Sequence, residues 1–281
     1  MNRRRRVAVT GAAGSIATGF VRSVQDTYDL ILIDLPGRIS AAQSALGSVV
    51  ETDLTNLEQM AGLLDGVDTV VHLAGERSPS ATWSSLYPAN IVATYNTFSA
   101  AVAAGCRRIV YASSVHAISG YPTTEQIRES DPVRPGDLYG VTKCFGEALG
   151  AYVADREGVS FVALRIGAFQ LPEQLSDPGS GWMLRDFCDP NDLYQLIESV
   201  IEATDIRFEI YNAVSGNRFS RLTMAKAADQ LGFVPSADAF ELSPPFRSAF
   251  DAVGGLDDKP AASGLRDELG RLAAKGAVWR G

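Results

Sequence analysis

The sequence predicts an α/β fold in which a doubly wound parallel sheet carries a small C-terminal lobe. Apolar runs rich in β-branched residues alternate with helical periods up to Gly167. Strict strand and helix alternation implies right-handed crossovers and a parallel sheet covered on both faces. After Gly167 this order breaks, because the stretch QLPEQLSDPGSG is rich in turn-forming residues. The lobe is expected to begin at this point.

The expected strands are short apolar runs bounded by turn residues. In chain order they are RVAVTG (6–11), YDLILIDL (28–35), SVVETDL (48–54), DTVVHLAG (68–75), RRIVYASS (107–114), VSFVALRIG (159–167) and FEIYNAV (208–214). Helices are expected at 14–25, near 55–64, and at 82–104, 138–157, 189–203 and 222–231, with an amphipathic surface helix at LRDELGRLAAK (265–275). Residues 1–165 and 189–213 then form the sheet domain, and residues 166–188 and 214–281 form the lobe over its carboxyl edge.

The composition is that of a soluble globular protein. Hydrophobic residues make up 46% and charged residues 21%, and no apolar run is long enough to cross a bilayer. The net charge of -8 disfavours a nucleic-acid surface, and the basic cluster at 3–6 is interpreted as a solvated terminus without the apolar region of a signal peptide. Three well-separated cysteines and two histidines predict neither a metal site nor disulfides, which favours a cytoplasmic protein.

A glycine-rich turn follows the first predicted strand. Gly11 supplies a tight turn, Gly14 lets the backbone approach a diphosphate, and the small Ala17 lets the next helix pack closely on the strand. The helix N-terminus then offers free N–H groups to an anion. Glycine spacing alone is a weak signal, so its context must support it.

That context is a carboxylate at the end of the second predicted strand. Asp34 lies twenty residues after Gly14, where it would accept hydrogen bonds from the ribose diol of a dinucleotide. Its charge favours NAD over NADP, although Arg38, just past the strand, could recruit a 2′-phosphate. Asp53, which follows the third strand, would bind the adenine amino group or serve as a helix N-cap.

A phenol and an ammonium stand one helical turn apart in LYGVTK, at Tyr139 and Lys143. Hydride transfer to nicotinamide needs a base for the alcohol proton, and a cation beside a tyrosine favours its phenolate. Lys143 could also hydrogen-bond the nicotinamide ribose. Ser114, at the end of a central strand, is the chosen hydroxyl partner for the substrate oxygen, with Ser113 as the weaker choice.

Together these residues resemble the extended short-chain dehydrogenases/reductases, the NAD-dependent epimerase/dehydratase type of Rossmann fold. The motifs that carry the resemblance are TGAAGSIA, Asp34, the DL pair at 53–54, HLAG at 72–75, NIVATYN at 90–96, Ser114 and YGVTK. Within that family the chain is most similar to uronate dehydrogenases, through RIVYASSVHAISGYP, LYGVTKCFGE and LRIGAF. Those enzymes oxidise the anomeric carbon of a hexuronic acid to a lactone with NAD.

The resemblance implies a set of site residues. Tyr139 is the expected base, Ser114 the hydroxyl partner, Lys143 the ribose ligand, and Asn90 a structural or proton-relay residue. The expected cofactor contacts are Gly11, Ala13, Gly14, Ser15, Ile16, Asp34, Asp53, Leu54, Leu73, Ala74, Gly75, Tyr139, Lys143 and Ile166. The expected substrate contacts are Arg77, Ser78, Ser114, Val115, His116, Tyr139, Trp182 and Arg185. No metal is expected, and the helices at 82–104 and 138–157 are expected to pair with a second copy as a homodimer.

Two residues depart from the uronate dehydrogenase pattern. Val115 stands where those enzymes have asparagine, and Trp182 stands where they have the arginine that binds the carboxylate. A carboxylate binds best to a bidentate arginine, so Arg77 and Arg185 are candidate replacements. Trp182 could instead stack on a sugar or aromatic ring. The substrate is therefore expected to be a sugar, a sugar acid or a related intermediate.

Two other functions fit the same motifs. A nucleotide-sugar epimerase would keep NAD bound through both half-reactions and release no NADH. A non-catalytic NAD sensor would function without Tyr139. A hydrolase does not fit, because Ser114 and His116 are too close in sequence for a catalytic triad and no G-x-S-x-G motif is present.

Overall fold

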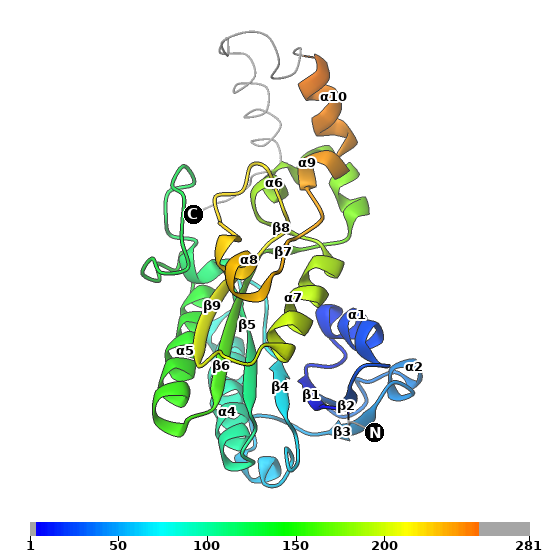
Figure 1. Cartoon of the computed structure of the whole chain (residues 1–281), viewed down its shortest axis with the longest axis vertical. Helices are drawn as coiled ribbons and strands as arrows, with labels where there is room; N and C mark the ends of the chain where they lie inside the picture. The colour runs from blue at the N-terminus through cyan, green and yellow to red at the C-terminus, as the bar shows by residue number, and fades with distance from the viewer. Residues whose placement is uncertain (1–3, 253–281) are drawn as a thin grey trace.

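The computed structural model describes residues 4–252 of the chain, and within it seven parallel strands form one sheet (Figure 1). The sheet order is β3-β2-β1-β4-β5-β6-β9. The strands are β1 (Arg6–Thr10), β2 (Asp29–Asp34), β3 (Ser48–Glu51), β4 (Thr69–His72), β5 (Arg108–Ser114), β6 (Ser160–Ile166) and β9 (Phe208–Ala213). All seven expected strands are present, and the order reverses between β1 and β4, which is where doubly wound sheets bind ligands.

Helices cover both faces of the sheet. One face packs against α1 (Ser15–Val24) and α7 (Pro190–Glu202) through side chains such as Phe20 and Ile197. The other face packs against α4 (Ala93–Ala103) through Phe98 and against the π-helical turn that follows α5 (Leu138–Tyr152) through Ala154. Alternate residues of each central strand point into the two apolar layers. Because both faces are buried, the sequences of these strands are continuous apolar runs.

The two long predicted helices contain π-helical turns. The first comprises α3 (Trp83–Leu86), a π-helical turn (Tyr87–Val92) and α4, which together match the expected 82–104. The second is α5 followed by a π-helical turn (Val153–Glu157), which matches 138–157. π-Helical turns are frequent at functional sites, and the first of these contains Asn90.

Glycines bring α5 directly onto the sheet. A Cβ atom at Gly146 would lie 2.3 Å from Cζ of Tyr111, and one at Gly150 would lie 2.1 Å from the Phe161 ring. No larger residue fits at either position unless the helix or the buried ring moves. The helix axis, and with it Tyr139 near its start, is therefore placed by backbone contact with two buried rings.

The expected helix near 55–64 is wrong. Only a short 3₁₀ turn forms there (Leu57–Met60), with Asn56 as its N-cap. Gly62 and Gly66 both take left-handed backbone conformations, with φ of +70° and +71°, and these end helical propagation. A four-residue helix that was not expected, α2 (Ala41–Ser44), forms instead after β2 behind a Ser40–Gln43 capping box.

Most of the segments that follow β6, other than α7 and β9, gather beyond one end of the sheet (Figure 1). A two-stranded sheet joins β7 (Ala168–Phe169) to β8 (Phe187–Cys188), and a separate apolar cluster there includes Leu175, Phe240 and Phe246. The helical elements are two 3₁₀ turns (Pro172–Ser176 and Pro178–Trp182), α6 (Met183–Asp186), α8 (Ala225–Leu231), α9 (Ala239–Leu242) and α10 (Pro244–Ala252). The expected helix at 222–231 begins at Ala225, and the one expected at 265–275 lies outside the described residues.

Across residues 4–252, no helix combines the length and apolar character needed to span a bilayer. The same part of the chain holds no group of His, Cys, Asp and Glu side chains arranged to bind a metal ion.

Candidate functional site

The glycine turn after β1 is shaped to admit an anion. Gly11 takes a φ of +66°, and a Cβ atom there would lie 2.7 Å from Cα of Ala74, so only glycine fits. Gly14 is the extended N-cap of α1, and no described side chain caps the helix or places an acidic group in its first turn. The first N–H groups of α1, from Ser15 and Ile16 onward, are thus oriented toward the space where a diphosphate would lie. The turn fits the pyrophosphate of a dinucleotide.

Asp34, the last residue of β2, also braces this turn. Its Oδ2 accepts a hydrogen bond from the Ala13 N–H at 2.8 Å, and its Oδ1 accepts one from the Leu35 N–H at 2.8 Å. A carboxylate has about four lone-pair sites, so it can still accept hydrogen bonds from a ribose diol. The predicted carboxylate therefore lies beside the predicted glycine turn.

Asp53 forms a local turn rather than a helix N-cap. Its Oδ1 accepts hydrogen bonds from the N–H and hydroxyl of Thr55, at 2.9 and 2.8 Å. The helical turn that follows is capped by Asn56. Leu54 is buried, and its carbonyl accepts a hydrogen bond from Asn96. Of the two roles left open by the sequence, the N-cap is excluded.

Tyr139 and Ser114 meet at the carboxyl edge of the sheet. Ser114 ends β5, and its Oγ accepts a hydrogen bond from the His116 N–H at 3.2 Å. Burial raises the pKa of the Tyr139 phenol to about 12, and a hydrogen bond from Ser114 opposes that rise. The carboxylates of Asp137 and Glu76 raise the pKa further, whereas Arg77 lowers it. The serine predicted from its strand-end position is therefore the one that contacts the predicted base.

Lys143 is buried below the Tyr139 ring. Its Nζ donates a hydrogen bond to the Ala112 carbonyl at 2.7 Å and lies 5.5 Å from the centroid of the Tyr139 ring and 5.0 Å from that of Tyr111. Burial lowers the pKa of Lys143 to about 8, although Glu147 raises it. The pKa of the Tyr139 phenol is nevertheless raised rather than lowered, because the desolvation of the phenol outweighs its favourable interactions.

Asn90 links the loop after β4 to α5. Its Oδ1 accepts a hydrogen bond from the Glu76 N–H at 2.7 Å, and its Nδ2 donates to the Glu76 carbonyl and to Oγ1 of Thr142, each at 2.9 Å. A Cβ atom at Gly75 would lie 2.9 Å from Oδ1 of Asn90 and 3.8 Å from Nζ of Lys143. These contacts favour the structural role for Asn90 over a proton relay.

His116 fixes the start of α5 through Asp137. The Nδ1 atom of His116 lies 2.6 Å from Oδ2 of Asp137, whose Oδ1 accepts the Gly140 N–H as the helix N-cap. The His116 ring meets the Tyr139 ring edge to face, with centroids 5.3 Å apart. Asp137 was not among the residues predicted from the sequence, although an aspartate directly before a helical period is a recognised N-cap signal.

A buried ion pair supports the same helix from below. Arg165 of β6 donates two hydrogen bonds to Glu147, from Nε and Nη2, each at 2.9 Å. Ser113 donates a third to Glu147 at 2.6 Å. Ser113 is therefore committed to this network, which removes it as the rival of Ser114. Periodicity gave no sign of this pair, since its members lie on different elements.

The predicted substrate residues are divided between two positions. Arg77 and Ser78 lie in the loop after β4, where Arg77 is exposed and near enough to lower the pKa of Tyr139. Arg185 is also exposed, but its Nη1 donates to the Thr123 carbonyl at 3.3 Å. Trp182 is 38% exposed, and Val115 packs against the apolar cluster that contains Ile118. Of the two candidate arginines, it is Arg77 whose charge lowers the pKa of Tyr139.

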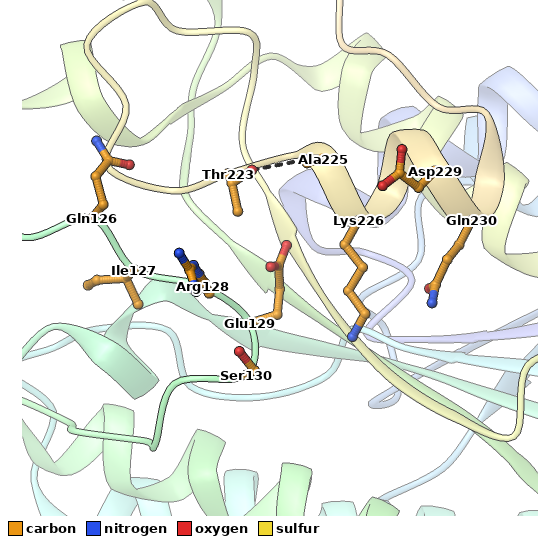
Figure 2. Close-up of a pocket in the computed structure, with 10 residues that line it drawn as sticks. All are labelled: Gln126, Ile127, Arg128, Glu129, Ser130, Thr223, Ala225, Lys226, Asp229 and Gln230. Atoms are coloured by element: carbon orange, nitrogen blue, oxygen red, sulfur yellow. Dashed lines mark hydrogen bonds between the residues drawn. The ribbon is translucent and has the colours of Figure 1, made fainter.

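The remaining predicted cofactor residues also follow strand ends. Leu73, Ala74 and Gly75 come directly after β4, and Ile166 ends β6. The pocket in Figure 2 lies elsewhere, between residues 126–130 and α8, and none of the predicted site residues lines it. The candidate site is thus the carboxyl edge of the sheet.

Comparison with known proteins identifies relatives of this chain. The model of the NAD-dependent epimerase/dehydratase family matches residues 7–178. L-arabinose 1-dehydrogenase (NAD(P)(+)) of Haloferax volcanii is 34% identical, over 82% of this chain and 96% of that protein. Uronate dehydrogenase of Pseudomonas putida is 31% identical, over 88% of each.

A solved structure shows the same architecture. The crystal structure of uronate dehydrogenase from Agrobacterium tumefaciens superposes with a TM-score of 0.76 at 29% identity, covering 93% of this chain and 92% of that one. A variant of that enzyme has been solved in complex with NAD. The predicted Rossmann fold, family resemblance and NAD dependence are confirmed by these similarities. Since the family model covers more than half of its length, this chain belongs to the NAD-dependent epimerase/dehydratase family.

Proposed function

We propose that the protein is an NAD-dependent dehydrogenase that oxidises a hydroxyl group of a sugar or sugar acid. The observation that carries this proposal is the Ser114–Tyr139 pair at the carboxyl edge of the sheet, with the Lys143 ammonium beneath the phenol ring. The glycine turn and Asp34 lie at the same edge and fit a dinucleotide. The proposed cofactor residues are those predicted from the sequence.

In the proposed mechanism, Ser114 and Tyr139 hold the substrate hydroxyl between them. The Ser114 hydroxyl orients the substrate oxygen, and Oη of Tyr139, as the phenolate, accepts its proton as the C–H bond at the same carbon breaks. NAD, when bound, supplies the hydride acceptor. Lys143 stabilises the negative charge that the phenol must carry, since its ammonium lies 5.5 Å from the ring centroid. The low exposure of Tyr139 limits competing water.

The proposed substrate is a cyclic sugar oxidised at its anomeric hydroxyl. Relatives named for L-arabinose 1-dehydrogenase and uronate dehydrogenase activities support this class. Trp182 supplies an apolar face in place of an arginine, which favours a sugar ring without a carboxylate at that position. Arg77, near Tyr139, is the proposed partner for any acidic group the substrate does carry.

We further propose that residues 166–188 and 214–281 form the substrate lobe, and that residues 1–165 and 189–213 form the sheet domain. The separate apolar cluster around Leu175 and Phe246 supports this division. A cytoplasmic location is proposed because the cysteines at 106, 144 and 188 are all free.

The proposed assembly is a homodimer formed through the helices at 82–104 and 138–157. Large apolar side chains on these helices are about half exposed: Trp83, Tyr87, Tyr95, Leu138, Val141 and Tyr152. Such a concentration of exposed apolar groups is typical of a protein interface. Light scattering at micromolar concentration tests this assembly, and a monodisperse monomer would exclude it.

The function is tested with a panel of aldoses and uronic acids, followed at the absorbance band of NADH. At least one sugar should give net NADH with the wild-type chain. Tyr139→Phe should then lose turnover at least 100-fold while NADH binding, measured by fluorescence titration, stays within about twofold. Copurified cofactor without net NADH would favour an epimerase, and NAD-dependent function that survives in Tyr139→Phe would favour a sensor.

A further inference from the structure

Two carboxylates, rather than one, stand at the ends of neighbouring strands beside the glycine turn. In the parallel register of β2 and β3, Asp34 is paired with Glu51. Partner residues in adjacent parallel strands point to the same face of the sheet. The side chain of Glu51 therefore starts from the same face and edge as the Asp34 side chain, although the dinucleotide motif of the sequence includes only Asp34.

Hydrogen bonds show where the Glu51 carboxylate lies. Its Oε1 accepts a hydrogen bond from the Gly37 N–H at 2.7 Å. Gly37 takes a left-handed conformation, with φ of +72°, in a turn closed by a hydrogen bond from the Arg38 N–H to the Leu35 carbonyl at 3.2 Å. This is the turn that directly follows Asp34. Glu51 thus places a negative charge against the segment that passes the ribose diol of a bound dinucleotide.

We propose that Glu51 is a specificity-determining residue that disfavours NADP. The inference rests on the proposed NAD-dependent function. A 2′-phosphate carries a charge between -1 and -2 at neutral pH and would lie between Asp34 and the turn that Glu51 contacts. Glu51 also fixes the turn that carries Arg38, a cation that could neutralise the phosphate. The negative charge of Glu51 and the turn conformation that it fixes are therefore both expected to weaken NADP binding.

The test is the ratio of the dissociation constants of NADH and NADPH, measured by fluorescence titration of the full chain without substrate. Glu51→Gln removes the charge but keeps an oxygen that accepts the Gly37 N–H. This variant should bind NADPH about 3- to 10-fold more tightly than the wild type, the size of one screened charge interaction. Its affinity for NADH should stay within about twofold.

Further variants separate charge from structure. Glu157→Gln makes the same change of charge before the amino end of β6, away from the carboxyl edge of the sheet, and should leave the ratio unchanged. Glu51→Ala also removes the acceptor of the Gly37 N–H, so it should shift the ratio at least as far as Glu51→Gln. In 1 M salt, where the screening length is about 3 Å, the difference between wild type and Glu51→Gln should largely disappear.

The outcomes distinguish this inference from the proposed function. An unchanged ratio in Glu51→Gln that still binds NADH would overturn the role of Glu51 and leave the dehydrogenase proposal intact. Equal tightening for both dinucleotides would also overturn it, because the charge would then act on the shared diphosphate. A wild-type chain that binds neither dinucleotide would refute both proposals.

Discussion

Replacing Lys143 with methionine should stabilise the protein while it destroys the proposed activity. The ammonium is buried, and burial lowers its pKa from 10.5 to about 8. One pKa unit corresponds to about 1.4 kcal/mol, so carrying this charge at pH 7 costs the folded state about 3 kcal/mol relative to the unfolded chain. Methionine has a similar length and no charge.

Part of that gain is offset by a lost hydrogen bond. Nζ of Lys143 donates to the Ala112 carbonyl, and leaving this carbonyl without its partner costs about 1 kcal/mol. The expected net gain for Lys143→Met at pH 7 is therefore about 2 kcal/mol in the free energy of unfolding. Urea denaturation of the two proteins in the absence of NAD measures this difference directly.

The same difference should depend on pH in a defined direction. Between pH 8 and 10.5 the unfolded chain keeps the lysine proton while the folded protein releases it, so wild-type stability rises with pH in this window. The advantage of Lys143→Met should accordingly fall from about 2 kcal/mol at pH 7 to near zero at pH 10. An advantage that is constant with pH, or a variant that is less stable at pH 7, would refute the reasoning.

A second lysine provides the control. Lys226 donates a hydrogen bond to the Ile210 carbonyl and pairs with Glu209, with its side chain 30% exposed. Lys226→Met makes the same chemical change where water still solvates the charge. It should lower stability by about 0–1 kcal/mol, and the loss should be similar at pH 7 and at pH 9.

Three further substitutions test the architecture of the site. Gly11→Ala should weaken NADH binding at least 10-fold in a fluorescence titration, because its Cβ would overlap the backbone of Ala74; unchanged binding would show that the turn can move. Glu147→Gln should lower the free energy of unfolding by about 3–5 kcal/mol in urea, since it leaves Arg165 buried and unpaired, whereas a loss below 1 kcal/mol would mean that water reaches the guanidinium. Asp137→Ala should cost about 1 kcal/mol by thermal or urea unfolding as a lost N-cap, and no loss would contradict the capping assignment.

The sheet could be predicted from the sequence because its signals are local. Each strand is a short apolar run bounded by turn residues, and all seven were found. The glycine turn and Asp34 were found for the same reason, since their spacing follows from the βαβ unit itself. The prediction of a helix near 55–64 was wrong because apolar periodicity favoured it, whereas Gly62 and Gly66, both visible in the sequence, take left-handed conformations that end a helix.

The electrostatics of the site could not be predicted in the same way. Spacing on one helix suggested that Lys143 acidifies Tyr139, but the pKa of the phenol depends on its burial by other segments. The orientation of Lys143 depends on the Ala112 carbonyl, which belongs to a strand 31 residues earlier. Likewise, the Glu147–Arg165 pair joins a helix to a strand, and no periodicity links the two.

The close contact of Gly146 and Gly150 in α5 with the rings of Tyr111 and Phe161 limits which substitutions this helix can accept. An atom added at Gly146 or Gly150 must displace either the helix or a buried ring. A displacement of about 1 Å at a reacting group can reduce a rate about 100-fold. New substrate preferences are therefore more accessible through changes in the segments after β6 than through changes on the sheet-facing side of α5.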